Sequence, residues 1–139
     1  MDASGRGEVD GGQQDKARPL VCVVDDDGSV RRALCTLLRS AGFDSHAWAG
    51  AQEFLHAGLA AQCRCLIADL RMPGMDGFEL QQSLRRSHPG VPVVFISAHA
   101  DEPARRRALA AGAVDLLGKP FSESALLHAV HRALEPGRP

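Results

Sequence analysis

Short apolar runs alternate along the chain with longer segments in which apolar residues recur every three or four positions. The short runs predict buried strands, and the longer spacing predicts helices with one apolar face. Strands are expected at Leu20–Val24, Phe43–Trp48, Cys65–Ala68, Val91–Ile96 and Ala113–Leu117. Helices are expected at about Gly28–Ala41, Ala51–Leu59, Gly77–Ser87, Asp101–Gly112 and Ser122–Leu134. Five strands and five helices therefore alternate strictly.

The first, third and fourth predicted strands are continuously apolar rather than apolar at every second position. Such strands are buried on both faces, as in a parallel sheet covered by helices. Alternation with helices then predicts a doubly wound α/β domain with right-handed crossovers. The common five-stranded solution is flavodoxin-like, with strand order 2-1-3-4-5. We expect a single domain at 19–135, after a flexible glycine-rich tail at 1–18 and before a short tail at 136–139.

Composition narrows the class of protein. A chain of 139 residues with 45% hydrophobic residues can fill one core, and a formal charge of −1 gives no general attraction to nucleic acid or anionic lipid. No apolar stretch approaches the ~20 residues of a membrane span, and an apolar signal segment is missing. We therefore expect a cytoplasmic protein with no direct nucleic-acid or membrane partner. The four cysteines are expected to be buried free thiols rather than zinc ligands.

Polar residues that can bind metal or phosphate follow four of the apolar runs. They are Asp25 and Asp26 after the first, Asp69 after the third, Ser97 after the fourth, and Lys119 one glycine beyond the fifth. Ligands of open parallel sheets bind outside the carboxyl ends of the strands, at a switch point that lies here between strands one and three. Oxygen-only ligands favour Mg²⁺ or Mn²⁺, and a hydroxyl with a mobile ammonium suits a phosphoryl group.

Two chemical interpretations follow from this set. In the first, Asp69 is the nucleophile and takes a phosphoryl group, while Asp25 and Asp26 hold the metal. In the second, Asp25 is the nucleophile and Asp27 the general acid, because VCVVDDDGSV resembles the hhhhDxDG[ST] opening of haloacid-dehalogenase-type phosphatases. Those enzymes also need a later acidic pair, which isolated glutamates near the end of the chain do not supply.

Residues 20–134 resemble the receiver domain of bacterial two-component response regulators. The matching stretches are VVDDDGSVRRAL, ADLRMPGMDGFEL, VPVVFISAH and AGAVDLLGKPF. GFDSHAWAGAQEFL and AVDLLGKPF are most similar to receivers that precede helix-turn-helix output domains in transcription factors. The resemblance implies a phosphoacceptor in a phosphorelay, with a sensor histidine kinase as donor and a downstream protein as target. A receiver-like fold that only binds partners is a further alternative, against which the complete acidic set argues.

The resemblance also implies a role for each site residue. Asp69 would accept the phosphoryl group from a phosphohistidine of the kinase. Direct ligands of Mg²⁺ would be Asp26, Asp69 and the backbone carbonyl of Arg71, with Asp25 acting through a metal-bound water. Ser97 would bind a phosphoryl oxygen. Lys119 would pair with the phosphate, aimed inward by a cis bond to Pro120.

Receivers usually switch by moving a Ser or Thr toward the phosphate while an aromatic side chain turns inward. Here the hydroxyl is Ser97, but the aromatic position is Leu116. We therefore expect Ser97 and the loop after the fourth strand to carry the coupling. Arg71 and His99, two residues past Asp69 and Ser97, are expected to tune the rate of phosphate hydrolysis.

The basic run Arg105–Arg107 on the fourth helix is expected to be mainly a solvated face. It would form inter-subunit salt bridges if the fourth helix, fifth strand and fifth helix made a homodimer surface, as in related receivers.

Overall fold

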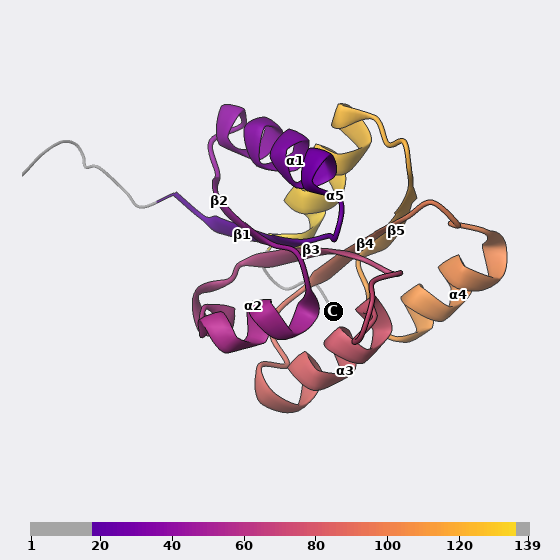
Figure 1. The fold of residues 1–139 in the computed structure, drawn as a ribbon. Coiled ribbons are helices and arrows are strands. Elements are labelled where there is room, and N and C mark those ends of the chain that lie inside the picture. Colours follow the sequence, from indigo (N-terminus) through magenta and orange to yellow (C-terminus); the bar gives the residue numbers. More distant parts are fainter. Residues whose placement is uncertain (1–17, 136–139) are drawn as a thin grey trace, which may run out of the picture.

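The computed structural model describes residues 18–135, which form a sheet between two layers of helices (Figure 1). The tails predicted at either end lie outside the described residues, except for Arg18. The strands are β1 (Leu20–Val24), β2 (Asp44–Trp48), β3 (Cys65–Asp69), β4 (Val93–Ser97) and β5 (Asp115–Gly118). The helices are α1 (Gly28–Ser40), α2 (Ala51–Ala57), α3 (Gly77–Ser87), α4 (Glu102–Ala110) and α5 (Glu123–Ala133), with a 3₁₀ turn at Ala60–Gln62.

All strand pairs are parallel, and the sheet order is β2-β1-β3-β4-β5. Helices α1 and α5 cover one face, and α2, α3 and α4 cover the other (Figure 1). The predicted doubly wound α/β fold and its strand order are confirmed. Because β1 and β3 are neighbours, the ends of these two strands meet at the switch point of the sheet.

Each face of the sheet has its own apolar core. Successive residues of β1 point to opposite faces, so Val21 and Val23 pack with the α1 and α5 side while Cys22 and Val24 pack with the other. The first core contains the buried leucines of α1 and α5, and the second is built around Phe54, Leu80 and Phe95, among others. This two-sided burial explains why the central strands are apolar at every position. All four cysteines are buried, and no disulfide joins them.

Two predicted strand boundaries were wrong by two residues at their start. Strand β4 begins at Val93 rather than Val91, because Pro92 has no amide hydrogen and the Val91 amide donates to the His88 carbonyl at 3.2 Å. Strand β5 begins at Asp115, because the Ala113 amide still closes the end of α4 on the Ala108 carbonyl at 3.0 Å. Both strands also run one residue further than predicted, so Ser97 belongs to β4 itself.

Helix α2 ends two residues earlier than predicted, because Gly58 adopts the left-handed conformation at φ +73°. The start of α3 depends on a second glycine for a different reason. A Cβ atom on Gly77 would lie 2.7 Å from the backbone oxygen of Asp69. Only glycine therefore lets α3 begin directly against the end of β3.

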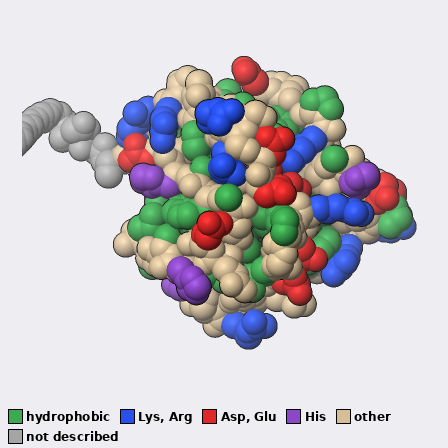
Figure 2. Space-filling model, in the orientation of Figure 1, with side chains coloured by type: hydrophobic (Ala, Val, Ile, Leu, Met, Phe, Trp, Pro, Cys, Tyr) green, Lys and Arg blue, Asp and Glu red, His purple; other side chains and the backbone are tan. Residues whose placement is uncertain are grey.

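Acidic and basic side chains are interspersed on the face of the molecule seen in Figure 2, with carboxylates gathered near its centre. Within residues 18–135, no helix has the length and apolar character needed to cross a membrane.

Candidate functional site

Three carboxylates meet where β1 and β3 end. Asp25 and Asp69 are buried, Asp26 is exposed, and one oxygen of each lies within 4.8 Å of the others. Like charges at this spacing repel by an amount on the order of a few kcal/mol per pair. The predicted convergence of Asp25, Asp26 and Asp69 is therefore present, and the cluster needs a positive charge to balance it.

Lys119 supplies the nearest positive charge, from the end of β5. Its Nζ donates to Asp69 Oδ2 at 3.0 Å and lies 2.8 Å from Asp25 Oδ2. The Lys119–Pro120 peptide bond is cis, as expected. Burial alone would lower the pKa of Lys119, but the two carboxylates outweigh it and raise that pKa. Lys119 is therefore charged at neutral pH and joins the two strand ends.

One buried carboxylate oxygen remains without a hydrogen-bond donor. Asp25 Oδ1 accepts from the Asp27 amide at 2.8 Å, whereas Asp25 Oδ2 makes only the ion pair with Lys119, which lacks hydrogen-bond geometry. A buried oxygen without a hydrogen-bond donor is energetically unfavourable unless a bound ligand interacts with it. Together with the exposed Asp26 and the nearby Asp69, it forms an all-oxygen donor set that fits a divalent cation.

Asp69 is held in a fixed orientation by the loop that follows it. Its Oδ1 accepts from the Arg71 amide at 3.1 Å, and its Oδ2 accepts from Lys119. Burial, followed by the neighbouring charge of Asp25, raises the pKa of Asp69, against the two hydrogen bonds that lower it. The Arg71 side chain itself is exposed. The carboxylate therefore faces the crevice with both oxygens oriented and an elevated proton affinity.

Ser97 is buried at the end of the adjacent strand, β4. Its Oγ accepts from the amide of His99 at 3.0 Å, and its carbonyl accepts from the Lys119 amide at 2.8 Å. The His99 side chain is exposed. The Ser97 hydroxyl thus helps to shape the loop before α4, and its backbone holds Lys119 in place.

Leu116 is buried in the core between the sheet and the layer formed by α2, α3 and α4. Its carbonyl accepts from Arg105 Nη1 of α4 at 3.0 Å. The Leu116 side chain therefore already lies in the core, so it needs no inward rotation of the kind expected for an aromatic side chain at this position.

The arrangement around Asp27 does not favour the phosphatase interpretation. Asp27 Oδ1 accepts from the amides of Ser29 and Val30 and from the Ser29 hydroxyl, so the carboxylate serves as the N-cap of α1. These hydrogen bonds, chiefly those from Ser29, lower the pKa of Asp27. A general acid needs the opposite shift.

Two contacts that support the site are not evident from the sequence. Arg31 Nη1 donates to the carbonyl of Asp25 at 2.7 Å, and the amide of Asp25 donates to the carbonyl of Trp48 at 3.1 Å. For the Arg31 contact, the only signal in the sequence is that Arg31 lies six residues after Asp25. The contact between Asp25 and Trp48 depends on the register between β1 and β2, which the sequence does not show.

The basic run on α4 is engaged within the chain. Arg105 pairs with Asp115 at 2.9 Å, Arg106 lies 3.5 Å from Glu102, and Arg107 lies over the ring of Phe78 at 3.9 Å. All three arginines are exposed, as expected for a solvated face, and Arg105 and Arg107 in addition have partners because α4 packs close to β5 and α3.

The comparisons with known proteins agree with this geometry. The family model for the response regulator receiver domain matches residues 21–131. Nodulation protein W of Bradyrhizobium diazoefficiens is 41% identical over 121 residues, which are 87% of this chain and 53% of that protein. The transcriptional regulatory protein FixJ of the same species is 36% identical, over 86% of this chain and 58% of its own length.

Among solved structures, the response regulator StyR superposes with a TM-score of 0.77 at 51% identity, covering 85% of this chain and 60% of that chain. The chain spans about half the length of the first curated relatives it matches. The family match covers the acidic cluster and all five strands except Leu20, the first residue of β1, and the matches do not support the haloacid-dehalogenase alternative. This chain belongs to the family of response regulator receiver domains.

Proposed function

We propose that the domain is the phosphoacceptor of a two-component phosphorelay and that Asp69 takes the phosphoryl group. One observation carries the proposal: at the switch point of the sheet, a buried carboxylate with raised pKa pairs with a lysine that also pairs with a second buried carboxylate. Such a group is oriented and accessible from the crevice, while the lysine offsets charge that develops on a phosphoryl oxygen. The domain would catalyse only its own phosphorylation and dephosphorylation.

In the proposed reaction, a carboxylate oxygen of Asp69 attacks the phosphorus of a phosphohistidine. The new O–P bond forms an acyl phosphate, the P–N bond breaks, and the imidazole leaves with its electron pair and takes a proton. Hydrolysis reverses the state of the domain: a water oxygen bonds to phosphorus, the acyl phosphate O–P bond breaks, and inorganic phosphate leaves the Asp69 carboxylate free.

Mg²⁺, or Mn²⁺ in its place, is the proposed cofactor. Asp26, Asp69 and the backbone carbonyl of Arg71 are the proposed direct ligands, with Asp25 acting through a water. The unpaired Asp25 Oδ2 and the all-oxygen donor set support this assignment. The bound ion would neutralise charge on the carboxylates and on the incoming phosphoryl group.

Ser97 is the proposed contact for a phosphoryl oxygen and the start of the switch. Its hydroxyl holds the His99 amide at 3.0 Å, so moving the hydroxyl toward a phosphate would release the loop that leads into α4. Leu116 is already buried and would repack without an aromatic turn. Chemical-shift changes in α4 and β5 on adding beryllofluoride would support this route, and their absence would refute it.

Arg71 and His99 are proposed to tune hydrolysis, because both are exposed beside the Asp69 and Ser97 ends of the strands. Replacing either with alanine should change the half-life of the acyl phosphate without preventing its formation. An unchanged half-life in both variants would remove this part of the proposal.

The proposed phosphodonor is a sensor histidine kinase. A cavity of about 470 Å³ between α1 and the loop after β5 lies beside Lys119 and is lined by Val30, Ala33, Pro120 and Phe121, among others. Its apolar walls next to the catalytic lysine suit a helical donor domain that brings its histidine to Asp69. We place the domain in the cytoplasm, where it would pass the signal to a downstream protein and act in transcription regulation.

A homodimer through α4, β5 and α5 is part of the proposal. Leu109 is 44% exposed and lies one helical turn from Arg105, whose side chain reaches the carbonyl of Leu116 in β5. It is the only large apolar side chain exposed to this degree within residues 18–135. Sedimentation should show less dimer for Leu109→Glu than for the parent protein after phosphorylation, and equal dimer would exclude this face.

The central test offers acetyl phosphate and Mg²⁺ to the purified domain and follows intact mass. The parent protein should gain one phosphoryl group that hydroxylamine removes, as expected for an acyl phosphate. Asp69→Ala should gain none. Retained labelling of this variant would overturn the assignment of Asp69 as the acceptor.

Asp27→Asn provides the matched control, because it removes a carboxylate next to the cluster that only caps α1. It should keep labelling. Loss of labelling with Asp27→Asn but not with Asp69→Ala would favour the phosphatase chemistry instead. No labelling of the parent protein by acetyl phosphate or a kinase would favour a fold that only binds partners.

A further inference from the structure

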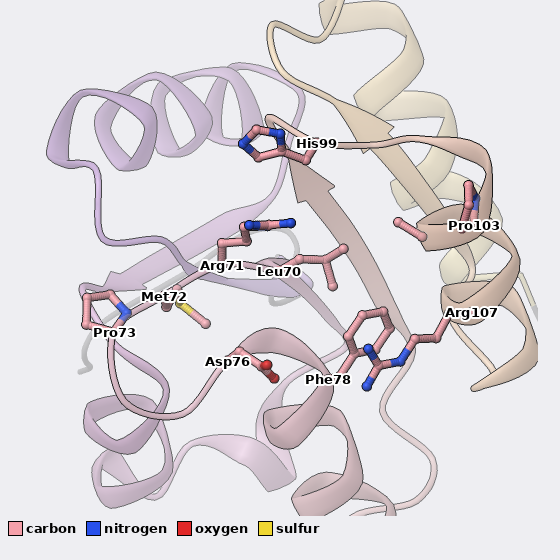
Figure 3. Close-up of a pocket in the computed structure, with 10 residues that line it drawn as sticks. Leu70, Arg71, Met72, Pro73, Asp76, Phe78, His99, Pro103 and Arg107 are labelled. Atoms are coloured by element: carbon pink, nitrogen blue, oxygen red, sulfur yellow. The ribbon is translucent and has the colours of Figure 1, made fainter.

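A groove of about 720 Å³ lies beside the phosphorylation site, between the loop after β3, the start of α3 and the first turns of α4. Figure 3 shows its lining residues around one opening, with His99 above, Pro73 on one side and Pro103 on the other. The groove is open to solvent along its length rather than enclosed.

The floor of the groove is apolar. Leu70 and Met72 are buried at its base, and the half-buried ring of Phe78 packs on Phe95 at a centroid distance of 5.3 Å. Ala104 continues this surface along α4. An apolar side chain of a partner that packs on this floor would be bound favourably, because the contact removes apolar surface from water.

The rim of the groove is cationic. Arg71 and Arg107 line the groove from opposite walls, and the Arg107 guanidinium lies against the Phe78 ring (Figure 3). Neither has a carboxylate at ion-pair distance among the described residues, which leaves both guanidinium charges without an acidic partner there. The one acidic lining residue, Asp76, is already used as the N-cap of α3 in a capping box with Glu79.

We propose that this groove docks a short acidic segment of a partner protein, with an apolar side chain on the floor and carboxylates on Arg71 and Arg107. Charge complementarity selects the partner, since two arginines face one carboxylate that is already bonded. A peptide segment fits better than a small ligand, because small-ligand sites usually enclose most of their ligand and this groove does not. The groove adjoins the acidic crevice through Arg71 and His99 but is not lined by Asp25, Asp26 or Asp69, so docking needs no phosphoryl group on Asp69.

The test uses the unphosphorylated domain and fluorescence anisotropy. The probe is a fluorescein-labelled peptide of alternating glutamate and leucine with one central phenylalanine, and a second peptide has glutamine at every glutamate. The acidic peptide should bind more tightly, and added salt should weaken it. Equal affinity for the two peptides, or no binding of either, would overturn the proposal. Either result would leave phosphorylation of Asp69 unaffected.

Neighbouring arginines on α4 provide matched variants. Arg107→Gln should weaken binding of the acidic peptide by roughly fivefold or more. Arg106→Gln removes the same charge from an exposed residue outside the groove and should change binding by less than about twofold. Equal loss in both variants would show only general attraction to positive charge and would overturn the site. Tighter binding of benzoate or of a DNA duplex than of the peptide, lost in Arg107→Gln, would assign the groove to a different occupant and also overturn it.

Discussion

Two regions of this domain pair buried aspartates with cations, and the ratio of negative to positive charges is opposite in the two. At Asp115, one carboxylate meets two arginines: Arg105 at 2.9 Å and Arg132 at 3.4 Å. Its Oδ1 also accepts from the Leu116 amide at 2.8 Å. At the ends of β1 and β3, three carboxylates meet one lysine, and Asp25 Oδ2 has no hydrogen-bond donor.

The difference separates a structural ion-pair network from the cluster that we propose to react. Around Asp115 the two arginines more than offset the single negative charge, and both carboxylate oxygens have partners, so the network joins α4 and α5 to β5 and leaves no negative charge for a cation. Around Asp69 the negative charge is in excess and one oxygen is left over. That excess of negative charge is unfavourable for the domain alone, and a bound cation would relieve it. The two regions should therefore respond differently to the same kind of substitution.

The largest expected effect comes from removing the cation of each region. Lys119→Met should slow phosphorylation of Asp69 by acetyl phosphate by about a hundredfold, because the donor that stabilises the developing phosphoryl charge is lost. Arg105→Met removes a cation from the Asp115 network instead and should leave that rate within about twofold. Time courses of intact mass measure both. Similar losses in the two variants would erase the distinction between the regions.

Replacing the aspartate in each of the two regions should change the free energy of unfolding in opposite directions. Asp115→Ala leaves two arginines and the Leu116 amide without their acceptor and should lower the free energy of unfolding by about 2 kcal/mol. Asp69→Asn removes one of three crowded negative charges and should raise it. Urea unfolding in metal-free buffer measures both changes. A loss of stability in both variants would mean that the Asp69 cluster is balanced after all.

Added Mg²⁺ should stabilise the protein through the cluster of Asp25, Asp26 and Asp69 and not through the Asp115 network. At ten times its dissociation constant, the ion should raise the free energy of unfolding by about 1.4 kcal/mol. Asp25→Asn should reduce this gain in stability, because it removes the negative charge of the carboxylate whose Oδ2 has no hydrogen-bond donor. Asp115→Ala should show the same gain as the parent protein. Thermal unfolding with and without Mg²⁺ gives the comparison, and a gain that Asp25→Asn does not alter would place the ion elsewhere.

The smallest expected effect is on the pH dependence of stability. Because the pKa of Asp69 is raised in the folded state, the folded protein binds this proton more tightly than the unfolded chain does. The contribution is therefore fully present below the ordinary aspartate pKa and is lost as pH rises through the raised value. Subtracting the urea-unfolding profile of Asp69→Asn from that of the parent should reveal this decline in metal-free buffer. An increase with pH in the difference would contradict the raised pKa.

The pattern of apolar runs was enough to predict the fold and the residues of the crevice. Continuous burial of Leu66, Ile67 and Ala68 on both sides requires helices above and below a parallel strand, which leaves few topologies. The starts of β4 and β5 were harder to predict. Val91 and Ala113 are apolar residues next to an apolar run, and the sequence does not show whether their amides bond within the sheet or close a turn. The competing acceptors, the carbonyls of His88 and Ala108, decided between them.

A polar residue that follows a buried parallel strand must emerge at the carboxyl edge of the sheet, so the order of residues is enough to predict which groups lie there. The way in which those groups share their partners depends on how the segments pack. The pairing of Lys119 with both Asp25 and Asp69, and the commitment of Asp27 to the α1 cap, depend on distances between segments far apart in the chain or on local backbone angles. The groove between α3 and α4 has the same origin, since Arg71 and Arg107 face one opening only after the two helices have packed.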